Sequence, residues 1–323
     1  MRKYIYPAKA RSVQTIHHIA PMTASLPTSL SNQAFFNVSA VDAGELSLPS
    51  HLFLDPCPPD EDKLVVPALC FLLRHSASEH VLLFDLGYRK DHHNYPPAVI
   101  RRISLFQPLT MTTDAAESLQ NGGLAPTAVT HVCLSHVHWD HAGDPRPFSN
   151  ATFLVGAGAR TLLQTGYPHD PDALFAADLL PSARTAFLDP TGPEWRPVGP
   201  FPRALDYFGD GSVYIVDAPG HLPGHVNALV RTSPDGGWVY LAGDSAHDWR
   251  IVAGEAGIVE RVDRELGVVV CAHKDKAAAE EHIARIRELL KLERVRVLLA
   301  HDTEWYKENR GGPMYWPGQF ETL

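Results

Sequence analysis

The stretch Ser135-His136-Val137-His138-Trp139-Asp140-His141-Ala142-Gly143 decides how the rest of the chain is interpreted. Within six residues it carries four side chains that can bind a metal ion: His136, His138, Asp140 and His141. The apolar run 130–134 before it predicts a strand that ends where the cluster begins. The two histidines that lie two residues apart point to one side of an extended chain, whereas the adjacent Asp and His diverge. Because His is the commonest metal ligand, the stretch predicts a site for two neighbouring ions.

Three later apolar runs also end in residues that can bind a metal. Residues 212–217 lead to His221, residues 237–241 to Asp244 and residues 295–299 to His301. In layered α/β proteins the loops after the strands meet at one edge of the sheet, so we expect these side chains beside the first cluster. The expected arrangement places His136, His138 and His221 on one ion, Asp140, His141 and His301 on the other, and Asp244 between them with a water.

Two zinc ions held in this way would lower the pKa of the bridging water and polarise a carbonyl group. We therefore expect hydrolysis by attack of a metal-bridging hydroxide, without a covalent enzyme intermediate. Asp140 is the first catalytic candidate, because it can hold the water and then protonate the leaving group. His247, close after the bridging Asp, is the second, as a pocket residue that assists the leaving group. His225 is expected to form a structural hydrogen bond, and Asp85, at a strand end, either shapes a turn or orients a metal-binding His.

The remaining pattern alternates between strands and helices. Residues 34–48 predict a first pair of strands, and residues 65–74 and 80–84 predict a hairpin. Helices are expected at 91–105, 113–122, 158–165, 171–179 and 274–291. Residues 188–203 predict a Pro-rich surface loop, residues 1–33 an N-terminal arm that wraps the body or covers a pocket mouth, and residues 309–323 an irregular tail. The strands fall into two groups, each followed by helices, which indicates two β-plus-α halves facing one another.

Composition excludes several classes of function. Of 323 residues, 45% are hydrophobic and 20% charged, as is usual for a folded enzyme. The formal net charge of -9 opposes a nucleic-acid partner, which requires a basic face. No apolar stretch of 18 residues predicts a membrane span, and the N-terminus has no apolar signal-peptide core. Four cysteines without a C-x-x-C pair favour a reducing, cytoplasmic location, with Cys271 in the core.

Two other catalytic arrangements fit the sequence poorly. Gly243-Asp244-Ser245-Ala246-His247 approaches a nucleophile elbow, but a His stands where the last glycine is required. Cys271 and His273 lie two apart on an expected strand, which would have to bend to bring them together as a Cys-His dyad. The metal site is therefore the favoured centre of the chemistry.

The order of these motifs resembles the metallo-β-lactamase superfamily over residues 34–305. The matching residues are the H-x-H-x-D-H cluster at 136–141, then Pro219-Gly220-His221, Gly243-Asp244 and the strand-end His301. The resemblance implies an α/β fold, the αββα sandwich of two ββα halves, with two zinc ions at one edge of a hydrolase domain at 34–323. It assigns the metal ligands to His136, His138, Asp140, His141, His221, Asp244 and His301. Asp85 matches the characteristic strand-end Asp of the superfamily.

Within the superfamily, the motifs are most similar to those of the quorum-quenching N-acyl homoserine lactonases. Those enzymes carry a Tyr three residues after the bridging Asp, where this chain has His247. The long N-terminal segment and the Trp305–Trp316 tail are closer to fungal relatives, some of which open lactam rings. The resemblance thus implies a dizinc hydrolase that opens a small cyclic ester, with a small carbonyl compound as its partner.

Three alternatives remain beside the cyclic ester. The same chemistry can act on a lactam or, as in glyoxalase II, on a thioester. A mono-iron persulfide dioxygenase is less favoured because the residues for a second metal are complete. The oligomeric state is left open by the sequence.

Overall fold

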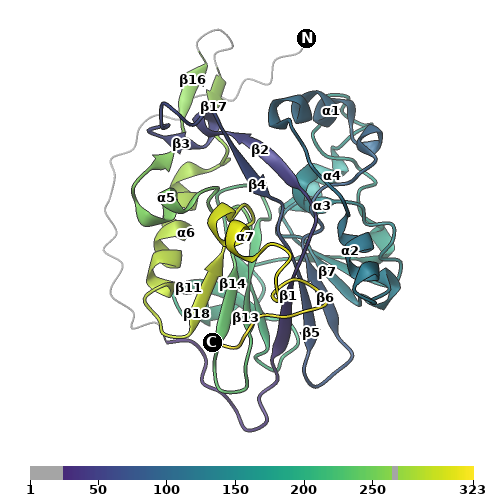
Figure 1. Ribbon diagram of the computed structural model, residues 1–323, viewed down its shortest axis with the longest axis vertical. Helices are drawn as coiled ribbons and strands as arrows, with labels where there is room; N and C mark the ends of the chain where they lie inside the picture. Colours follow the sequence, from purple (N-terminus) through teal and green to yellow (C-terminus); the bar gives the residue numbers. More distant parts are fainter. Residues whose placement is uncertain (1–24, 264–267) are drawn as a thin grey trace.

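Two six-stranded sheets lie face to face at the centre of the computed structural model, which describes residues 25–263 and 268–323 (Figure 1). In the N-terminal sheet, β1 and β5 and then β5 and β6 pair antiparallel, and the strands from β6 to β9 are parallel. Its order is β1 (Phe36–Val41), β5 (Cys70–His75), β6 (Val81–Phe84), β7 (His131–Cys133), β8 (Thr152–Gly156) and β9 (Thr185–Leu188).

The C-terminal sheet is antiparallel except at one end, where β18 runs parallel to β14. Its order is β10 (Arg196–Val198), β11 (Phe201–Asp206), β12 (Val213–Asp217), β13 (Val226–Arg231), β14 (Trp238–Leu241) and β18 (Val295–Leu298). Each half of the chain therefore supplies one sheet. The two-halves arrangement expected from the sequence is confirmed.

Side-chain alternation along the strands explains why the sheets pack in this way. In β5, Phe71 and Leu73 belong to the core between the sheets, whereas Cys70 and Leu72 face the opposite side. In β13, Ala228 enters the central core and its neighbour joins the outer cluster. A strand with both faces covered must be apolar at every position, as these runs are.

Helices cover the outer face of each sheet and complete the αββα sandwich. On the N-terminal side these are α2 (Ala115–Asn121) and α4 (Ala159–Gln164), and on the C-terminal side α5 (Trp249–Ala253) and α6 (Lys276–Leu289). Asp114 begins α2 with a capping box, since its side chain accepts from the N–H of Glu117 and the Glu117 side chain accepts from the N–H of Asp114. The predicted fold class is confirmed.

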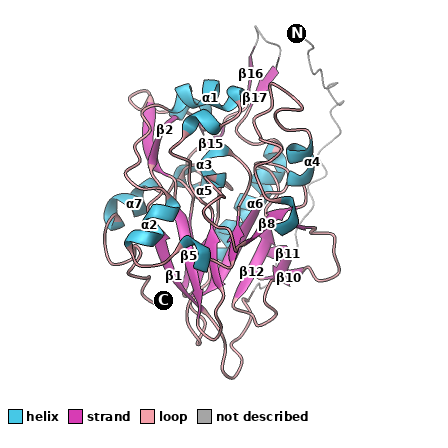
Figure 2. Ribbon diagram, turned by 90° about the vertical axis from the view of Figure 1, so that its right-hand side faces the viewer, coloured by secondary structure: helices cyan, strands magenta, loops and turns pink. Residues whose placement is uncertain are grey.

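A separate apolar cluster covers one end of the sandwich. It joins the hairpin of β2 (Glu45–Pro49) and β4 (Lys63–Pro67) to α1 (Pro97–Ile103) and to Trp139 in the short helix α3 (Trp139–Ala142). Figure 2 shows α1 and β2 at the same end of the molecule, above α3. Four further short strands form two small sheets. One pairs β3 (Leu54–Asp55) with β15 (Gly257–Ile258), and the other pairs β16 (Arg261–Asp263) with β17 (Val268–Val270).

Several local predictions are wrong. Residues 34–48 do form two strands, but these lie in different sheets rather than pairing with each other. Residues 171–179 are not helical, because the backbone groups of Phe175 and Ala177 bond with Tyr167 instead. Residues 188–203 contain β10 and the start of β11. Pro197 is tolerated there because β10 stands at the end of the strand order.

The other helices agree with the sequence more closely. Residues 91–105 form a 3-10 turn at His92–Asn94 and then α1, which begins only at Pro97, a residue suited to the first helical position. The helices expected at 113–122, 158–165 and 274–291 are α2, α4 and α6. No helix in the described ranges is long and apolar enough to cross a membrane.

Both ends of the described chain are attached to the sandwich. Residues 1–24 of the predicted arm lie outside the described residues; further on, the buried Arg231 donates to the Ser29 hydroxyl at 3.0 Å and the Pro27 carbonyl at 2.8 Å. At the other end, α7 (Thr303–Asn309) is followed by an irregular tail. The tail runs along β1, where the N–H groups of Trp316 and Phe320 donate to β1 carbonyls. This covers a strand that would otherwise be the edge of its sheet.

Candidate metal centre

The ends of four strands deliver the candidate ligands to one place. The loop after β7 carries His136 and His138 and runs directly into α3, which contains the Asp and His of the first motif. The other three candidates follow β12, β14 and β18: His221, Asp244 and His301. All seven are buried or nearly so, and they form two adjacent groups.

A glycine turn aims Asp244 into the site. Gly243 has φ +47°, and a Cβ there would lie 2.8 Å from both the Ser135 Cβ and the His225 Nε2. His225 accepts from the N–H of Asp244 at 3.1 Å and donates from Nδ1 to the Ala218 carbonyl at 2.9 Å. Burial lowers the pKa of His225 to about 4, so the ring is neutral and can accept a hydrogen bond at Nε2 while it donates one from Nδ1. The predicted structural role of His225 is confirmed.

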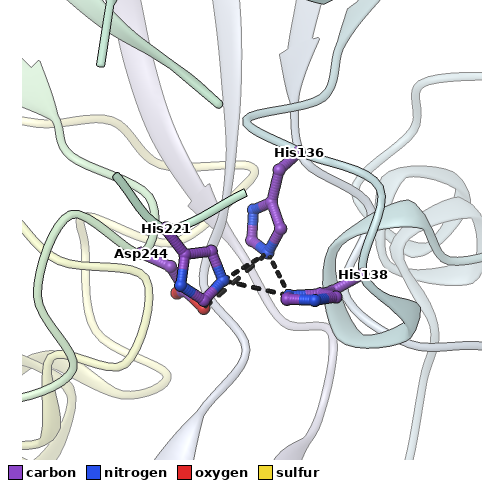
Figure 3. A group of neighbouring side chains, drawn as sticks. All are labelled: His136, His138, His221 and Asp244. Atoms are coloured by element: carbon purple, nitrogen blue, oxygen red, sulfur yellow. Dashed lines mark hydrogen bonds and ion pairs between the residues drawn. The ribbon is translucent and has the colours of Figure 1, made fainter. Parts of the chain in front are cut away.

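The first group consists of His136, His138, His221 and Asp244 (Figure 3). The His136 Nε2, His138 Nδ1 and His221 Nε2 atoms lie 2.8 to 3.1 Å from one another. The Asp244 Oδ2 atom completes the group at 3.3 Å from His221 Nε2. Burial lowers the pKa of His136 and His221 well below its ordinary value and that of His138 to about 3. Three neutral rings that point nitrogens at one spot are in the form that binds a cation.

The second group consists of Asp140, His141 and His301. The other oxygen of Asp244, Oδ1, lies 3.3 Å from His141 Nε2 and 3.4 Å from His301 Nε2. The Nδ1 atom of His301 donates to the Pro67 carbonyl at 2.7 Å, which leaves its Nε2 free to face the group. Asp244 thus presents one oxygen to each group.

Asp85 supports the second group from behind. Its carboxylate accepts from the Ser135 N–H at 2.6 Å and the Ser135 hydroxyl at 2.8 Å, and it lies 2.9 Å from His141 Nδ1. The residue has φ +61°, a conformation that Asp tolerates better than most residues. Burial disfavours a charged His141, but the Asp244 and Asp85 carboxylates outweigh it and raise the pKa of that ring well above its usual value.

Unpartnered atoms test whether the two groups fit metal ions. His141 Nε2 and Asp244 Oδ1 are buried and have no hydrogen-bond partner in the described part of the chain. Burying a polar atom without a partner costs about 1–3 kcal/mol. A cation in the second group would satisfy both atoms, and imidazole and carboxylate are ligands that zinc accepts. The residues present therefore fit a pair of cations.

A cavity opens onto both groups. Its apolar wall comes mainly from the cluster that joins β2, β4, α1 and Trp139. Its polar wall includes Asp140, His247 and Arg102. The His247 ring packs against Phe53, with ring centroids 4.6 Å apart, and its Nε2 lies 3.1 Å from Asp244 Oδ2. His247 therefore lines the pocket, as the sequence predicted.

The sequence predicted only part of the environment of Cys271 and overlooked three other residues at this site. Cys271 is half-buried; it packs against the core on the C-terminal side, as predicted, and it also lines the cavity, because it follows the short strand β17. Arg102 and Phe53 had no motif that could reveal them. His273 is buried beside the first group, and the sequence offered only its position two residues after Cys271 as a signal.

An αββα sandwich with His and Asp side chains grouped after the ends of its strands defines a class of metal-dependent proteins. The chain belongs to the metallo-beta-lactamase superfamily, whose sequence profile matches residues 65–301. It is 34% identical over 303 residues to the cytochrome P450 monooxygenase mpaDE' of Penicillium brevicompactum, over 86% of this chain and 35% of that protein. The chain thus spans about a third of the length of such relatives.

Two further comparisons concern the sequence family and the fold. Gamma-lactamase FDB1 of Fusarium pseudograminearum is 31% identical over 207 residues, which cover 62% of this chain and 50% of that protein. A solved N-acyl homoserine lactone hydrolase, with the product N-hexanoyl-L-homoserine at its catalytic metal centre, superposes with a TM-score of 0.63. That match covers 88% of this chain and 99% of the other at 20% identity, so it concerns the fold. The predicted membership of the superfamily is confirmed.

Proposed function

We propose that this chain is a dizinc hydrolase that opens a small cyclic ester. The observation that carries the proposal is the carboxylate of Asp244, which gives Oδ2 to the first group of side chains and Oδ1 to the second. A single carboxylate placed in this way suits two cations that share a ligand. His136, His138 and His221 would hold one ion, Asp140, His141 and His301 the other, and Asp244 both.

Bound zinc would supply a Lewis acid for the substrate carbonyl and make a water strongly nucleophilic near neutral pH. The chain's own residues then control position and protons. Asp140 lies at the cavity wall and 3.7 Å from His301 Nε2, so its carboxylate can take a proton from the water and pass it to the leaving oxygen. His247, fixed between Phe53 and Asp244, can hydrogen-bond the oxygen that leaves the ring.

The cavity walls support a substrate with an apolar body and a polar ring. Leu48, Phe53, Val99, Phe106 and Leu174 line the same cavity as the histidines. An apolar wall opposite a few convergent polar groups is the usual form of a small-molecule site. The solved relative binds a product with an acyl chain and a homoserine head, which agrees with this division.

A lactam is the second candidate substrate. The observation in its favour is the match to gamma-lactamases, including MBL2 of Gibberella moniliformis at 36% identity over 169 residues. An amine leaves less readily than an alkoxide unless it is protonated, so this reaction would depend more strongly on Asp140 and His247.

Metal removal and a substrate panel test the proposal together. The protein would be stripped with a chelator, titrated with zinc, and assayed against γ-lactones, N-acyl homoserine lactones, γ-lactams and thioesters. We expect activity to disappear with the metal and return at two zinc ions per chain, with lactones turned over fastest. Hydrolysis that survives metal removal would refute the metal mechanism, and preference for lactams would replace the first substrate with the second.

The domain organisation forms part of the same proposal. Residues 34–323 would constitute one catalytic unit, and residues 1–33 an arm attached to it. The contacts of Arg231 with Pro27 and Ser29 support that attachment.

A further inference from the structure

A third group of histidines lies beside the first metal group. His221, His247 and His273 come from the loops after β12, β14 and β17, and all three are buried. Their ring centroids are 5.1, 5.2 and 5.3 Å apart, so the rings form the corners of a nearly equilateral triangle. One nitrogen from each ring lies within 4.8 Å of the other two.

His273 is the member that the dizinc proposal does not use. Its side chain is buried, yet neither ring nitrogen has a hydrogen-bond partner in residues 25–263 and 268–323. Buried imidazoles are nearly always hydrogen-bonded or metal-bound, so such a ring calls for a ligand.

His221 can serve two ions at once. Its Nε2 atom faces His136 and His138 in the first metal group. Its Nδ1 atom is buried and unpartnered as far as the structure is described. The ring therefore has one nitrogen for the dinuclear centre and one for a further ligand.

We propose that His221, His247 and His273 form an accessory site for a third divalent cation of the zinc type. Three imidazoles with an open fourth position are an established zinc ligand set. Imidazole favours zinc, copper and nickel, whereas calcium and magnesium prefer oxygen ligands. The site should therefore not bind calcium or magnesium. The inference shares His221 with the proposed dinuclear centre and rests on that proposal to this extent.

Charge makes this site weaker than the other two. None of its three ligands is a carboxylate, and Asp244 Oδ2, which lies 3.1 Å from His247 Nε2, is shared with the first group. A neutral imidazole carries one N–H proton, so His221 must lose that proton to solvent before both of its nitrogens can bind ions. The third ion should therefore bind last and respond to the free zinc concentration.

Zinc stoichiometry measures the accessory site directly. The full chain would be stripped of metal, dialysed against increasing free zinc, and its metal content determined by mass spectrometry. We expect three ions per chain, two tight and one weaker. His273→Gln should bind two with the affinities of the tight pair.

His282→Gln is the matched control. His282 is equally buried, but its Nε2 lies 3.1 Å from Asn227 Nδ2 and 3.0 Å from the Tyr240 hydroxyl, away from the triangle. This variant should still bind three ions. If it also binds two, the loss in His273→Gln reflects general damage and the proposal fails.

Crystals of the zinc-loaded wild type give a second measurement that needs no variant. Anomalous scattering at the zinc edge should show a third peak at about 2.0–2.1 Å from a ring nitrogen of His273. Saturation at two ions, with no peak there, overturns the accessory site and leaves the dizinc proposal standing. Fewer than two ions would overturn both.

Discussion

The two metal groups differ in how their ligands are supported. In the second group, His141 is backed by the Asp85 carboxylate and His301 by the Pro67 carbonyl, and Asp140 adds a charge of its own. In the first group the ligands are imidazoles apart from the shared Asp244. Behind His136, the Ser135 hydroxyl lies 3.0 Å from Nδ1 and is the one partner of that atom among the described residues.

This difference assigns different tasks to the two positions. Hydrogen bonds behind a ligand fix its orientation and raise its basicity, so the second group should hold its cation firmly. In the proposed dizinc centre, neutral rings would leave more positive charge on the first cation, which would make that position the better one for polarising a carbonyl. The predictions below are ordered by the size of their expected effect on catalysis.

Loss of Asp244 should affect both positions equally. In Asp244→Ala no carboxylate remains between the two groups, so zinc should fall below two per chain and turnover should drop roughly 10³-fold, since each metal contributes several kcal/mol. Metal content and kcat measure this. Asp302→Asn is the control, because Asp302 is also a buried Asp but accepts from Trp305 N–H and Trp249 Nε1 instead. Retention of both ions in Asp244→Ala would contradict the shared-ligand geometry.

Asp140→Asn should separate metal binding from catalysis. The amide oxygen can still face the second ion but the side chain cannot take a proton, so we expect kcat to fall about 10²-fold with the first ion retained. Unchanged kcat would show that another group moves the proton.

Asp85→Asn acts on one position only. It weakens the hydrogen bond behind His141, and losses of this kind reduce metal affinity about 10–100-fold. Competition with a chelator should therefore show one weakened and one unchanged site. If both sites weaken alike, Asp85 supports the loop as a whole through Ser135 rather than one ligand.

The same contrast explains what the sequence could and could not predict. His136 to His141 are local, so their spacing reveals the cluster, and the apolar runs before His221, Asp244 and His301 reveal strand ends that the sandwich brings together. Neither local spacing nor a strand pattern reveals that His273 belongs to the site, because its neighbours come from the distant loops after β12 and β14. The false helix at 171–179 failed for a similar reason, since the bonds to Tyr167 are tertiary.

The smallest effect concerns a buried histidine that holds no ion. Burial lowers the pKa of His282 to about 3, against about 6.5 in an unfolded chain. Between these values the unfolded state binds more protons, so stability is complete above pH 6.5 and falls as the pH drops toward 3. The loss approaches about 1.4 kcal/mol per pH unit.

The His282→Gln variant lacks this titratable ring, and His282 is not a proposed ligand of any of the zinc ions. We expect unchanged activity at neutral pH and a stability difference from wild type that narrows between pH 6.5 and 4. Urea unfolding of the zinc-loaded wild type and variant at several pH values measures it, because the site histidines are the same in both proteins and their contribution cancels in the difference. A difference that stays constant with pH would show that His282 gains its proton in the folded state as easily as in the unfolded one.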